Sequence, residues 1–543
     1  MPSTPLQPLV VSDLSVSYAS ARDTRPVLDG VHLVAQPGRR IALVGENGTG
    51  KSTLLRAIAG RLPRRATLTG TIDVPRDLVM LGQEVPFRPD ASVGAVLAAT
   101  LQPLRRAVAE VERLAGLLAS ADDERATAEY DAALERAVSL DAWDADRRAE
   151  VAAGQLGIGQ LDPDRAVGAL SGGQRTRLAL ATVMTTRPAC LLLDEPTNHL
   201  DDEALDVLTG FLTGLPGVVL LASHDRVLLD DVATDLVDLD AGALGTDGGG
   251  GRRFGGGWSD YEEHRRRARE RWEATYAQQQ EELEALRAAA ALGTDAIAHD
   301  RGPRDNDRFI YAFKAGKVDR AHARRRRDAE LRLERAEQAQ VRKPRPVLRL
   351  AAPLTAGSAG PGPTVRVRDL GVAGRLRLER LDVSAGEHLL VSGGNGTGKS
   401  TLLGVLAGRL SPTSGDVSVS ATRVAELEQD VVFADPRRPA QSTYDALVPE
   451  GSPRLAELGL LHARDLRTPV GLLSVGQRRR VGLAVAIAGR PDLLLLDEPT
   501  NHVSLALAGE LEEAVGASAG TVVVATHDRW LRRRWAGTEV RLG

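Results

Sequence analysis

The sequence of 543 residues contains a single cysteine, Cys190. One thiol excludes an internal disulfide and argues against the usual zinc and iron–sulfur sites, which need several thiolates, so we expect a reducing compartment. No apolar run approaches the roughly 18 residues of a membrane helix, and the first residues lack the basic-then-apolar layout of a secretion signal. The sequence therefore predicts a cytoplasmic protein with no membrane span and no stable membrane partner.

Aromatic residues and lysines are also scarce. Aromatics make up 3% of the chain, so its cores must consist of leucine, valine and alanine. Of 69 basic residues only five are lysines, a bias typical of GC-rich genomes: Lys51, Lys314, Lys317, Lys343 and Lys399. A lysine that survives this bias indicates a position that needs a compact ammonium, although chance survival is the alternative for Lys343. The net charge of −4 gives no general attraction to nucleic acid, so any such contact needs a local basic patch.

The chain is an internal duplication. A glycine-rich loop near residue 45 recurs near residue 393, and the sequence LLLDEPTNH occurs in both halves. Lys51 and Lys399 are 348 positions apart, whereas Ser171 and Ser474 are only 303 apart. The first half therefore holds an insertion of roughly 43 residues between Gln83 and Ser171.

The inserted segment, at about residues 97–153, repeats leucine, valine and alanine at helical spacing. We predict a helical hairpin that forms an arm on the first domain. Residues 101–150 contain 12 acidic and 7 basic side chains, which makes the arm a poor phosphate binder and favours contact with a protein. The alternative is an extension that packs only on its own domain.

Charged helices are predicted between the two halves, at residues 258–345. One stretch runs for more than thirty residues without glycine or proline, and a helix of about 30 residues spans roughly 45 Å. Two such helices in antiparallel order would carry a tip, at about residues 292–320, well beyond the surface of a domain. The glycine-rich segment that follows, at 346–363, is expected to be flexible.

Each half contains the pattern Gly-x-x-x-x-Gly-Lys-Ser between an apolar strand and a helix, which is the setting of a phosphate-binding loop. Backbone N–H groups and the helix N-terminus surround the phosphates, the lysine reaches the β and γ phosphates, and the serine coordinates Mg²⁺. The predicted nucleotide-binding residues are Gly45, Asn47, Gly48, Gly50, Lys51, Ser52 and Thr53 in the first half and Gly393, Asn395, Gly396, Gly398, Lys399, Ser400 and Thr401 in the second.

Two apolar strands end in adjacent carboxylates, Asp194-Glu195 and Asp497-Glu498. Strands without polar residues are typical of a buried parallel sheet. Because side chains alternate along a strand, we expect the aspartate to face Mg²⁺ and the glutamate to face the water that attacks the γ phosphate. Two desolvated carboxylates require a cation, which supports the interpretation as a nucleotide site.

Together with these motifs, the segments LSGGQ at 170–174 and LSVGQ at 473–477 resemble the signature motifs of ATP-binding cassette (ABC) proteins. The resemblance implies an α/β fold with two tandem ABC-type P-loop ATPase domains that meet head to tail, a long antiparallel helical linker and an arm in the first domain. It implies ATP and Mg²⁺ as cofactors at two sites. The implied signature residues are Ser171, Gly172, Gly173, Gln174, Ser474, Gly476 and Gln477; the implied Mg²⁺ ligands are Ser52, Gln83, Asp194, Ser400, Gln429 and Asp497; and the implied catalytic residues are Glu195, Glu498, His224 and His527. The predicted domains are residues 1–257, the linker at 258–345 and residues 364–543.

The second half departs from the family pattern at three positions. Tyr18 matches the aromatic residue that stacks on adenine, but Gly374 stands at the corresponding position of the second half. Val475 replaces a signature glycine, and Ser504 stands where the first half has Asp201. Both glutamates are present, so we expect two competent sites with unequal rates.

The fused pair of ATPase domains, the arm and the long linker together resemble the ABC-F class. These are translation factors whose ATP-bound form binds the ribosome near the tRNA exit site, with the linker directed toward the peptidyl-transferase centre and the P-site tRNA. The segment DNDRFIYAFKAGK, at 305–317, resembles the linker of antibiotic-resistance members from actinomycetes. The implied function is protection of the ribosome from a drug by a monomer that contacts rRNA and P-site tRNA.

Two alternatives stay open at this point. A housekeeping ABC-F translation factor has the same architecture, and the ATPase subunit of a drug exporter is less favoured because it would gain nothing from a basic linker. A DNA-repair or chromosome-organising ATPase would be expected to contain cysteine-rich zinc modules or hundreds of coiled-coil residues, and the sequence has neither.

The predicted tip of the linker is basic and aromatic. Residues 301–327 contain ten basic and three acidic side chains together with three aromatic rings. Such a mixture suits phosphate neutralisation and stacking on unpaired bases, although the rings could equally hold the loop against its own helices. The candidate RNA-binding residues are Arg308, Phe309, Tyr311, Phe313, Lys314, Lys317, Arg324, Arg325, Arg326 and Arg327.

Overall fold

The computed structural model describes residues 7–18, 26–45, 48–82, 87–118, 124–197, 200–240, 251–291, 324, 327–328, 331–343, 353–356, 363–394, 396–500 and 505–542. The chain divides into two compact units. The first contains residues 1–240, 249–258 and 347–543, and the second contains residues 241–248 and 259–346.

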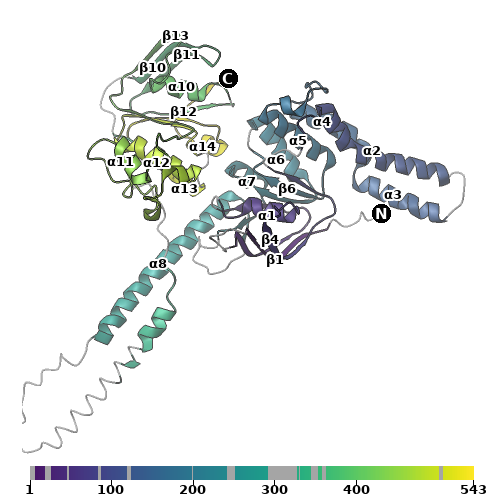
Figure 1. The fold of residues 1–543 in the computed structure, drawn as a ribbon, viewed down its shortest axis with the longest axis horizontal. Coiled ribbons are helices and arrows are strands. Elements are labelled where there is room, and N and C mark those ends of the chain that lie inside the picture. Colours follow the sequence, from purple (N-terminus) through teal and green to yellow (C-terminus); the bar gives the residue numbers. More distant parts are fainter. Residues whose placement is uncertain are drawn as a thin grey trace, which may run out of the picture. The chain divides into compact units, whose positions relative to one another are not determined.

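The first half of the chain combines an antiparallel sheet with a larger, mainly parallel one (Figure 1). The antiparallel sheet has the order β2-β1-β4, formed by β1 (Leu9–Tyr18), β2 (Leu28–Ala35) and β4 (Ala66–Asp73). The six-stranded sheet has the order β5-β6-β7-β3-β8-β9, formed by β3 (Arg40–Val44), β5 (Leu78–Leu81), β6 (Cys190–Asp194), β7 (Val218–Ala222), β8 (Asp235–Asp238) and β9 (Arg252–Gly255). Only β9 pairs antiparallel in this sheet. Its helices are α1 (Lys51–Ile58), α4 (Ala145–Gln155), α5 (Gly172–Thr186), α6 (Asp202–Gly214) and α7 (Arg226–Val232).

The second half repeats this arrangement. Its antiparallel sheet has the order β11-β10-β13, formed by β10 (Pro363–Val372), β11 (Leu376–Ser384) and β13 (Ser414–Val419). The parallel sheet has the order β14-β15-β16-β12-β17, formed by β12 (His388–Gly393), β14 (Val424–Leu427), β15 (Leu493–Asp497), β16 (Thr521–Ala525) and β17 (Thr538–Leu542). Its helices are α10 (Lys399–Leu406), α11 (Ala440–Leu447), α12 (Val475–Ala488), α13 (Leu505–Gly516) and α14 (Arg529–Arg534). The predicted duplication is confirmed, and β9 is the one strand of these sheets in the first half that has no counterpart among the described strands of the second.

The central strands β6, β7, β15 and β16 are buried along their whole length. This explains their unbroken apolar sequences, because both faces of a parallel sheet are covered. The parallel strands place their carboxyl ends at one edge of each sheet, and loops at this edge carry ligand sites in open α/β folds.

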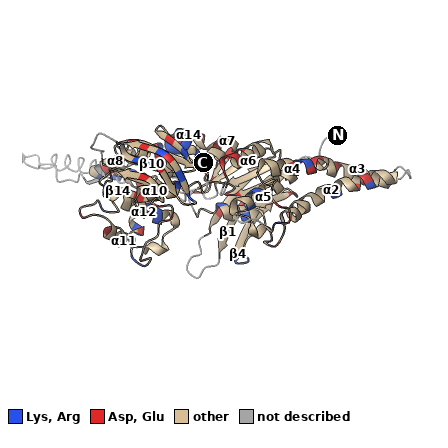
Figure 2. Ribbon diagram, turned by 90° about the horizontal axis from the view of Figure 1, so that it is seen from above, with Lys and Arg blue, Asp and Glu red and all other residues tan. Residues whose placement is uncertain are grey.

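The predicted arm is present in the first half. It consists of α2 (Val93–Leu118) and α3 (Glu124–Ser139), which lie side by side in Figure 1. Leu104, Val111 and Ala137 belong to a small apolar cluster between the helices. Both acidic and basic residues occur along the arm (Figure 2), and Arg105 pairs with Asp146 at 2.5 Å.

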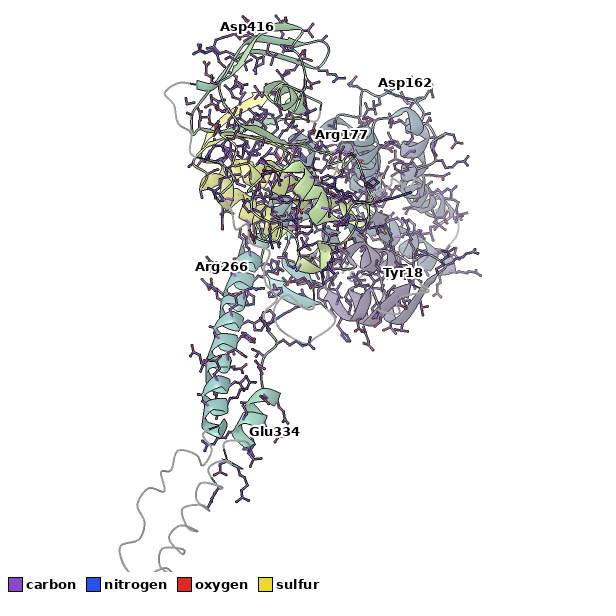
Figure 3. The ribbon with its side chains drawn as sticks, turned by 60° about the vertical axis from the view of Figure 1, so that its left-hand side comes forward. Tyr18, Asp162, Arg177, Arg266, Glu334 and Asp416 are labelled. Atoms are coloured by element: carbon purple, nitrogen blue, oxygen red, sulfur yellow. The ribbon has the colours of Figure 1, made fainter. Side chains whose placement is uncertain are left out.

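The long helix α8 (Trp258–Ala291) belongs to the second unit from Ser259 onward, together with a returning segment that has helical residues 331–338 (Figure 3). Trp272 Nε1 donates to the carbonyl of Arg342 at 2.9 Å, and Gln279 Oε1 accepts from Val341 N at 2.8 Å. Arg287 and Glu337 add an ion pair at 2.9 Å. The predicted tip lies outside the described residues. Within the described part of the chain, no helix has the length and apolar character needed to cross a membrane.

Cys190 begins β6 and is fully buried. Burial, with a smaller contribution from the charge of Asp77, raises the pKa of its thiol to about 12. Because the thiolate is the reactive form, we expect no alkylation of the native protein by iodoacetamide at pH 8 and complete alkylation in denaturant. Mass spectrometry reports this directly, since the chain has no second cysteine. Rapid labelling of the native protein would contradict the burial of β6.

Candidate nucleotide sites

The two phosphate-loop sequences connect β3 to α1 and β12 to α10, as their pattern predicts. Gly50 precedes α1 with φ of 98°, and Gly398 precedes α10 with φ of 96°. A Cβ atom at Gly50 would lie 2.6 Å from Leu28 Cδ2, so both the backbone angle and the space require glycine. Asn47 and Asn395 lie outside the described residues.

Both loop lysines are buried, with relative exposures of 8% for Lys51 and 7% for Lys399. Lys51 Nζ donates to the carbonyl of Gly45 at 2.7 Å, and Lys399 Nζ donates to the carbonyls of Gly393 and Gly394 at 2.9 and 3.0 Å. These carbonyls hold each ammonium group at the N-terminus of the following helix, where its charge adds to the positive end of the helix dipole.

In each site the serine that follows the loop lysine makes a hydrogen bond to the aspartate at the end of a central strand. Ser52 Oγ donates to Asp194 Oδ1 at 2.9 Å, and Asp194 Oδ2 is buried without a hydrogen-bond partner. In the second site burial raises the pKa of Asp497, against a hydrogen bond from Ser400 that lowers it, and Asp497 Oδ1 is likewise unpartnered. Buried oxygens with a free lone pair are the ligands that Mg²⁺ prefers, so these residues fit the ion.

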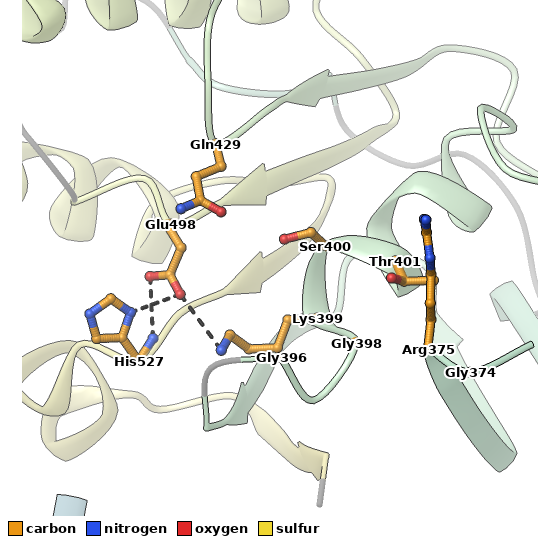
Figure 4. Close-up of a pocket in the computed structure, with 10 residues that line it drawn as sticks. All are labelled: Gly374, Arg375, Gly396, Gly398, Lys399, Ser400, Thr401, Gln429, Glu498 and His527. Atoms are coloured by element: carbon orange, nitrogen blue, oxygen red, sulfur yellow. Dashed lines mark hydrogen bonds and ion pairs between the residues drawn. The ribbon is translucent and has the colours of Figure 1, made fainter. Parts of the chain in front are cut away.

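Glu498 follows β15 and is 5% exposed. His527 Nδ1 lies 2.8 Å from Glu498 Oε1, and Lys399 Nζ lies 3.8 Å from the same oxygen (Figure 4). Thr526 Oγ1 donates to Glu498 Oε2 at 3.0 Å. Burial alone would raise the pKa of Glu498, but the hydrogen bond and charge of His527, together with Lys399, outweigh it and lower the pKa. The partners of Glu498 in the second site therefore favour its ionised form.

Glu195, the counterpart in the first site, has weaker partners. His224 Nε2 lies 3.3 Å from Glu195 Oε1, and burial raises the pKa of Glu195 to about 7, offset only in part by Lys51. Ser223 stands where the second site has Thr526, and its hydroxyl lies 3.4 Å from Thr197 Oγ1. The pKa values of the two catalytic candidates are thus shifted in opposite directions although their sequence motifs are the same.

The backbone at both glutamates is left-handed, with φ of 53° at Glu195 and 48° at Glu498. Each backbone N–H is fixed by the neighbouring strand, because Glu195 N donates to Ala222 O and Glu498 N to Ala525 O, both at 2.8 Å. Such a conformation is costly for a residue with a side chain and is typical of functional sites. Nothing in the sequence pattern indicates this turn.

The signature segments begin helices α5 and α12 with the same capping box. Ser171 Oγ accepts from Gln174 N at 3.2 Å, and Gln174 Oε1 accepts from Ser171 N at 3.1 Å. Ser474 and Gln477 make the equivalent pair at 3.2 and 2.9 Å. The serine and glutamine of the motif therefore build the helix start itself, and Gly172, Gly173 and Gly476 form its first turn.

One residue of the second site was missed by sequence reasoning. Arg479 is 3% exposed, and its Nη2 donates to the carbonyl of Asp497 at 2.6 Å and to the carbonyl of Glu498. The corresponding residue of the first half is Thr176. The only available signal was the run of three arginines directly after the second signature, which resembles a solvated charge run.

The remaining predicted residues are placed as follows. Tyr18 ends β1, whereas Gly374 lies in the turn between β10 and β11 with φ of 67°. Gln429 lines the pocket of the second site, which is formed by Gly374, Arg375, Gly396, Gly398, Lys399, Ser400, Thr401, Gln429, Glu498 and His527. Arg324 and Arg327 are helical. Gln83, Ser504, Arg308, Phe309, Tyr311, Phe313, Lys314, Lys317, Arg325 and Arg326 lie outside the described residues.

Fold and site together define a tandem ATP-binding cassette protein. The family model described as ABC transporter matches residues 28–198 and 377–501. The solved structure of an RNase-L inhibitor superposes on 96% of this chain and 85% of its own, with a TM-score of 0.53. The two sequences are 17% identical, so this likeness shows a shared fold alone.

Two relatives narrow this class. The tylosin resistance ATP-binding protein TlrC of Streptomyces fradiae is 38% identical over 98% of this chain and 97% of its own. The energy-dependent translational throttle protein EttA of Mycobacterium tuberculosis is 30% identical over 95% of this chain and 88% of its own. The chain belongs to the ABC-F family of ATP-binding cassette proteins.

Proposed function

We propose that this protein hydrolyses ATP at two sites and uses the nucleotide cycle to bind the ribosome and protect it from an antibiotic. The proposed binding position is near the tRNA exit site, in the cytoplasm, with the linker directed toward the peptidyl-transferase centre and in contact with rRNA and P-site tRNA. The observation that carries the proposal is the 38% identity to a tylosin resistance protein over nearly the full length of both chains, linker included.

The chemistry follows from the geometry of the second site. Lys399 and the start of α10 bind the phosphates, which directs the γ phosphate toward Glu498. The oxygen of the attacking water forms a bond to the γ phosphorus while Glu498 accepts its proton, and the bond from the γ phosphorus to the bridging oxygen breaks, which releases ADP and phosphate. His527 holds the carboxylate in place. Ser400, Gln429 and Asp497 would hold Mg²⁺, which would neutralise phosphate charge.

The first site has the same parts in Lys51, Ser52, Asp194, Glu195 and His224. We propose that each phosphate loop is completed by the signature segment of the other domain, so that nucleotide binding closes the pair and hydrolysis reopens it. Because Gly374, Val475 and Ser504 depart from the family pattern in the second half, the two sites are proposed to turn over at unequal rates.

The second candidate function is a housekeeping role in translation, favoured by the 30% identity to a translational throttle protein. The two functions can be distinguished by their effects on drug tolerance and on growth. A protective factor changes drug tolerance and leaves drug-free growth unaffected, whereas a housekeeping factor changes growth without any drug.

The test is expression of the chain in a drug-sensitive bacterium, with minimum inhibitory concentrations measured for a macrolide, a lincosamide and a streptogramin. We expect a rise of several-fold for at least one class. Replacing residues 292–323 by a short glycine–serine linker should remove the protection while ATP hydrolysis by the purified protein persists. Unchanged sensitivity to all three classes would overturn the protective role.

A further inference from the structure

The pocket of the second site has two chemically different ends (Figure 4). Glu498, His527 and Gln429 lie at one end, and Lys399 lies between them and the loop. Gly374 and Arg375 form the other end. Because the lysine and the helix start bind phosphates and the γ phosphate faces Glu498, the ribose and base must lie toward Gly374 and Arg375.

A side chain that could contact the base is absent at Gly374, where an added Cβ would meet nothing within 4 Å. Arg375 follows it as the last residue of a four-residue β-turn, closed by a hydrogen bond from Arg375 N to the carbonyl of Val372 at 3.0 Å. The backbone of Arg375 packs on the phosphate loop, since a Cβ at Gly398 would lie 2.7 Å from the Arg375 carbonyl oxygen. This turn therefore fixes Arg375 beside the nucleotide pocket.

The guanidinium of Arg375 is exposed, and within the described part of the chain it makes no hydrogen bond or ion pair. In Figure 4 its side chain runs beside Thr401, at the end of the pocket away from Glu498. A guanidinium is planar and weakly hydrated, so it stacks on a flat π surface as an aromatic ring does, and arginine contributes in this way to base binding elsewhere.

We propose that Arg375 binds the base of the nucleotide in the second site by stacking its guanidinium plane on the purine. This inference rests on the proposed function, because it requires that the second site binds ATP. Tyr18 ends the equivalent strand of the first half, so the two sites use different side chains for the same purpose.

The test uses full-length protein with Lys51→Ala, which disables the first site, and calorimetry with two probes. MgATP has a base, and magnesium tripolyphosphate has none. Arg375→Ala should weaken MgATP binding about 5-fold and leave tripolyphosphate binding unchanged. Arg375→Phe should restore MgATP affinity and Arg375→Lys should not, since only the former keeps a flat π surface. Arg377→Ala, an exposed arginine on β11, is the matched control without effect.

The other outcomes each overturn the inference. Equal losses for both probes, or rescue by lysine and not by phenylalanine, would assign Arg375 to the phosphates. Unchanged MgATP affinity of the Arg375→Ala variant would show that Arg375 does not contact the nucleotide. Failure of the Lys51→Ala parent to bind MgATP would overturn ATP binding at the second site itself, and the inference with it, before any change at Arg375 is compared.

Discussion

Replacing both candidate catalytic glutamates, by Glu195→Gln with Glu498→Gln, is expected to slow ATP hydrolysis about 100-fold or more and to hold the protein on the ribosome. Glutamine keeps the shape of the side chain but cannot accept the proton of the attacking water. The phosphate loops are untouched, so MgATP still binds and the closed form accumulates. Sedimentation of cell lysate through sucrose with ATP should show the variant with 70S particles, and its expression should arrest translation.

The matched control is Glu203→Gln with Glu513→Gln, two exposed glutamates on α6 and α13. It removes the same two charges and should hydrolyse ATP and sediment like the parent protein. If the catalytic double variant binds MgATP yet stays at the top of the gradient, the ribosome is not the partner. Recovery in the membrane fraction would favour an exporter subunit.

Removing both loop lysines, by Lys51→Ala with Lys399→Ala, is also expected to abolish ATP hydrolysis. Unlike the glutamate double variant, however, this protein should not sediment with ribosomes. Each ammonium is buried and fixed by loop carbonyls where the β and γ phosphates bind. Loss of its charge-assisted hydrogen bonds should weaken MgATP binding about 100-fold per site. Without nucleotide the domains do not close, so this variant should stay free of ribosomes.

Lys343→Ala is the control for the lysine pair, because Lys343 is one of the three lysines outside the loops. It should bind MgATP normally. Two variants that lack hydrolysis but differ in ribosome binding would separate nucleotide binding from turnover. Comigration of the lysine double variant with ribosomes would show instead that docking does not require ATP.

Much of this fold could be predicted because the chain contains the same motifs twice. The glycines, lysine and serine of each loop imply a strand before them and a helix after them, and α1 and α10 begin at those lysines. The arm was located by comparing spacings between the halves. These predictions succeed because they depend on local backbone requirements that residue types express directly.

Other features could not be predicted because they depend on contacts between distant residues. Arg479 acts on carbonyl groups 18 and 19 positions away, and carbonyls leave no signature in a sequence. The opposite pKa shifts of Glu195 and Glu498 arise from burial, which dominates at Glu195, and from the close contacts of His527 and Thr526 with Glu498, which only coordinates reveal. The assignment of the predicted RNA-binding residues stays a prediction.

The contacts inside the linker unit have a consequence for its evolution. Trp272 and Gln279 of α8 bind the returning segment through the backbone groups of residues 339, 341 and 342. Backbone groups are the same whatever side chain they carry, so substitutions in the returning segment leave this pairing intact, except for proline at 341, which would remove a donor. Selection can therefore revise the sequence of the segment in small steps, while Trp272 and Gln279 stay under constraint.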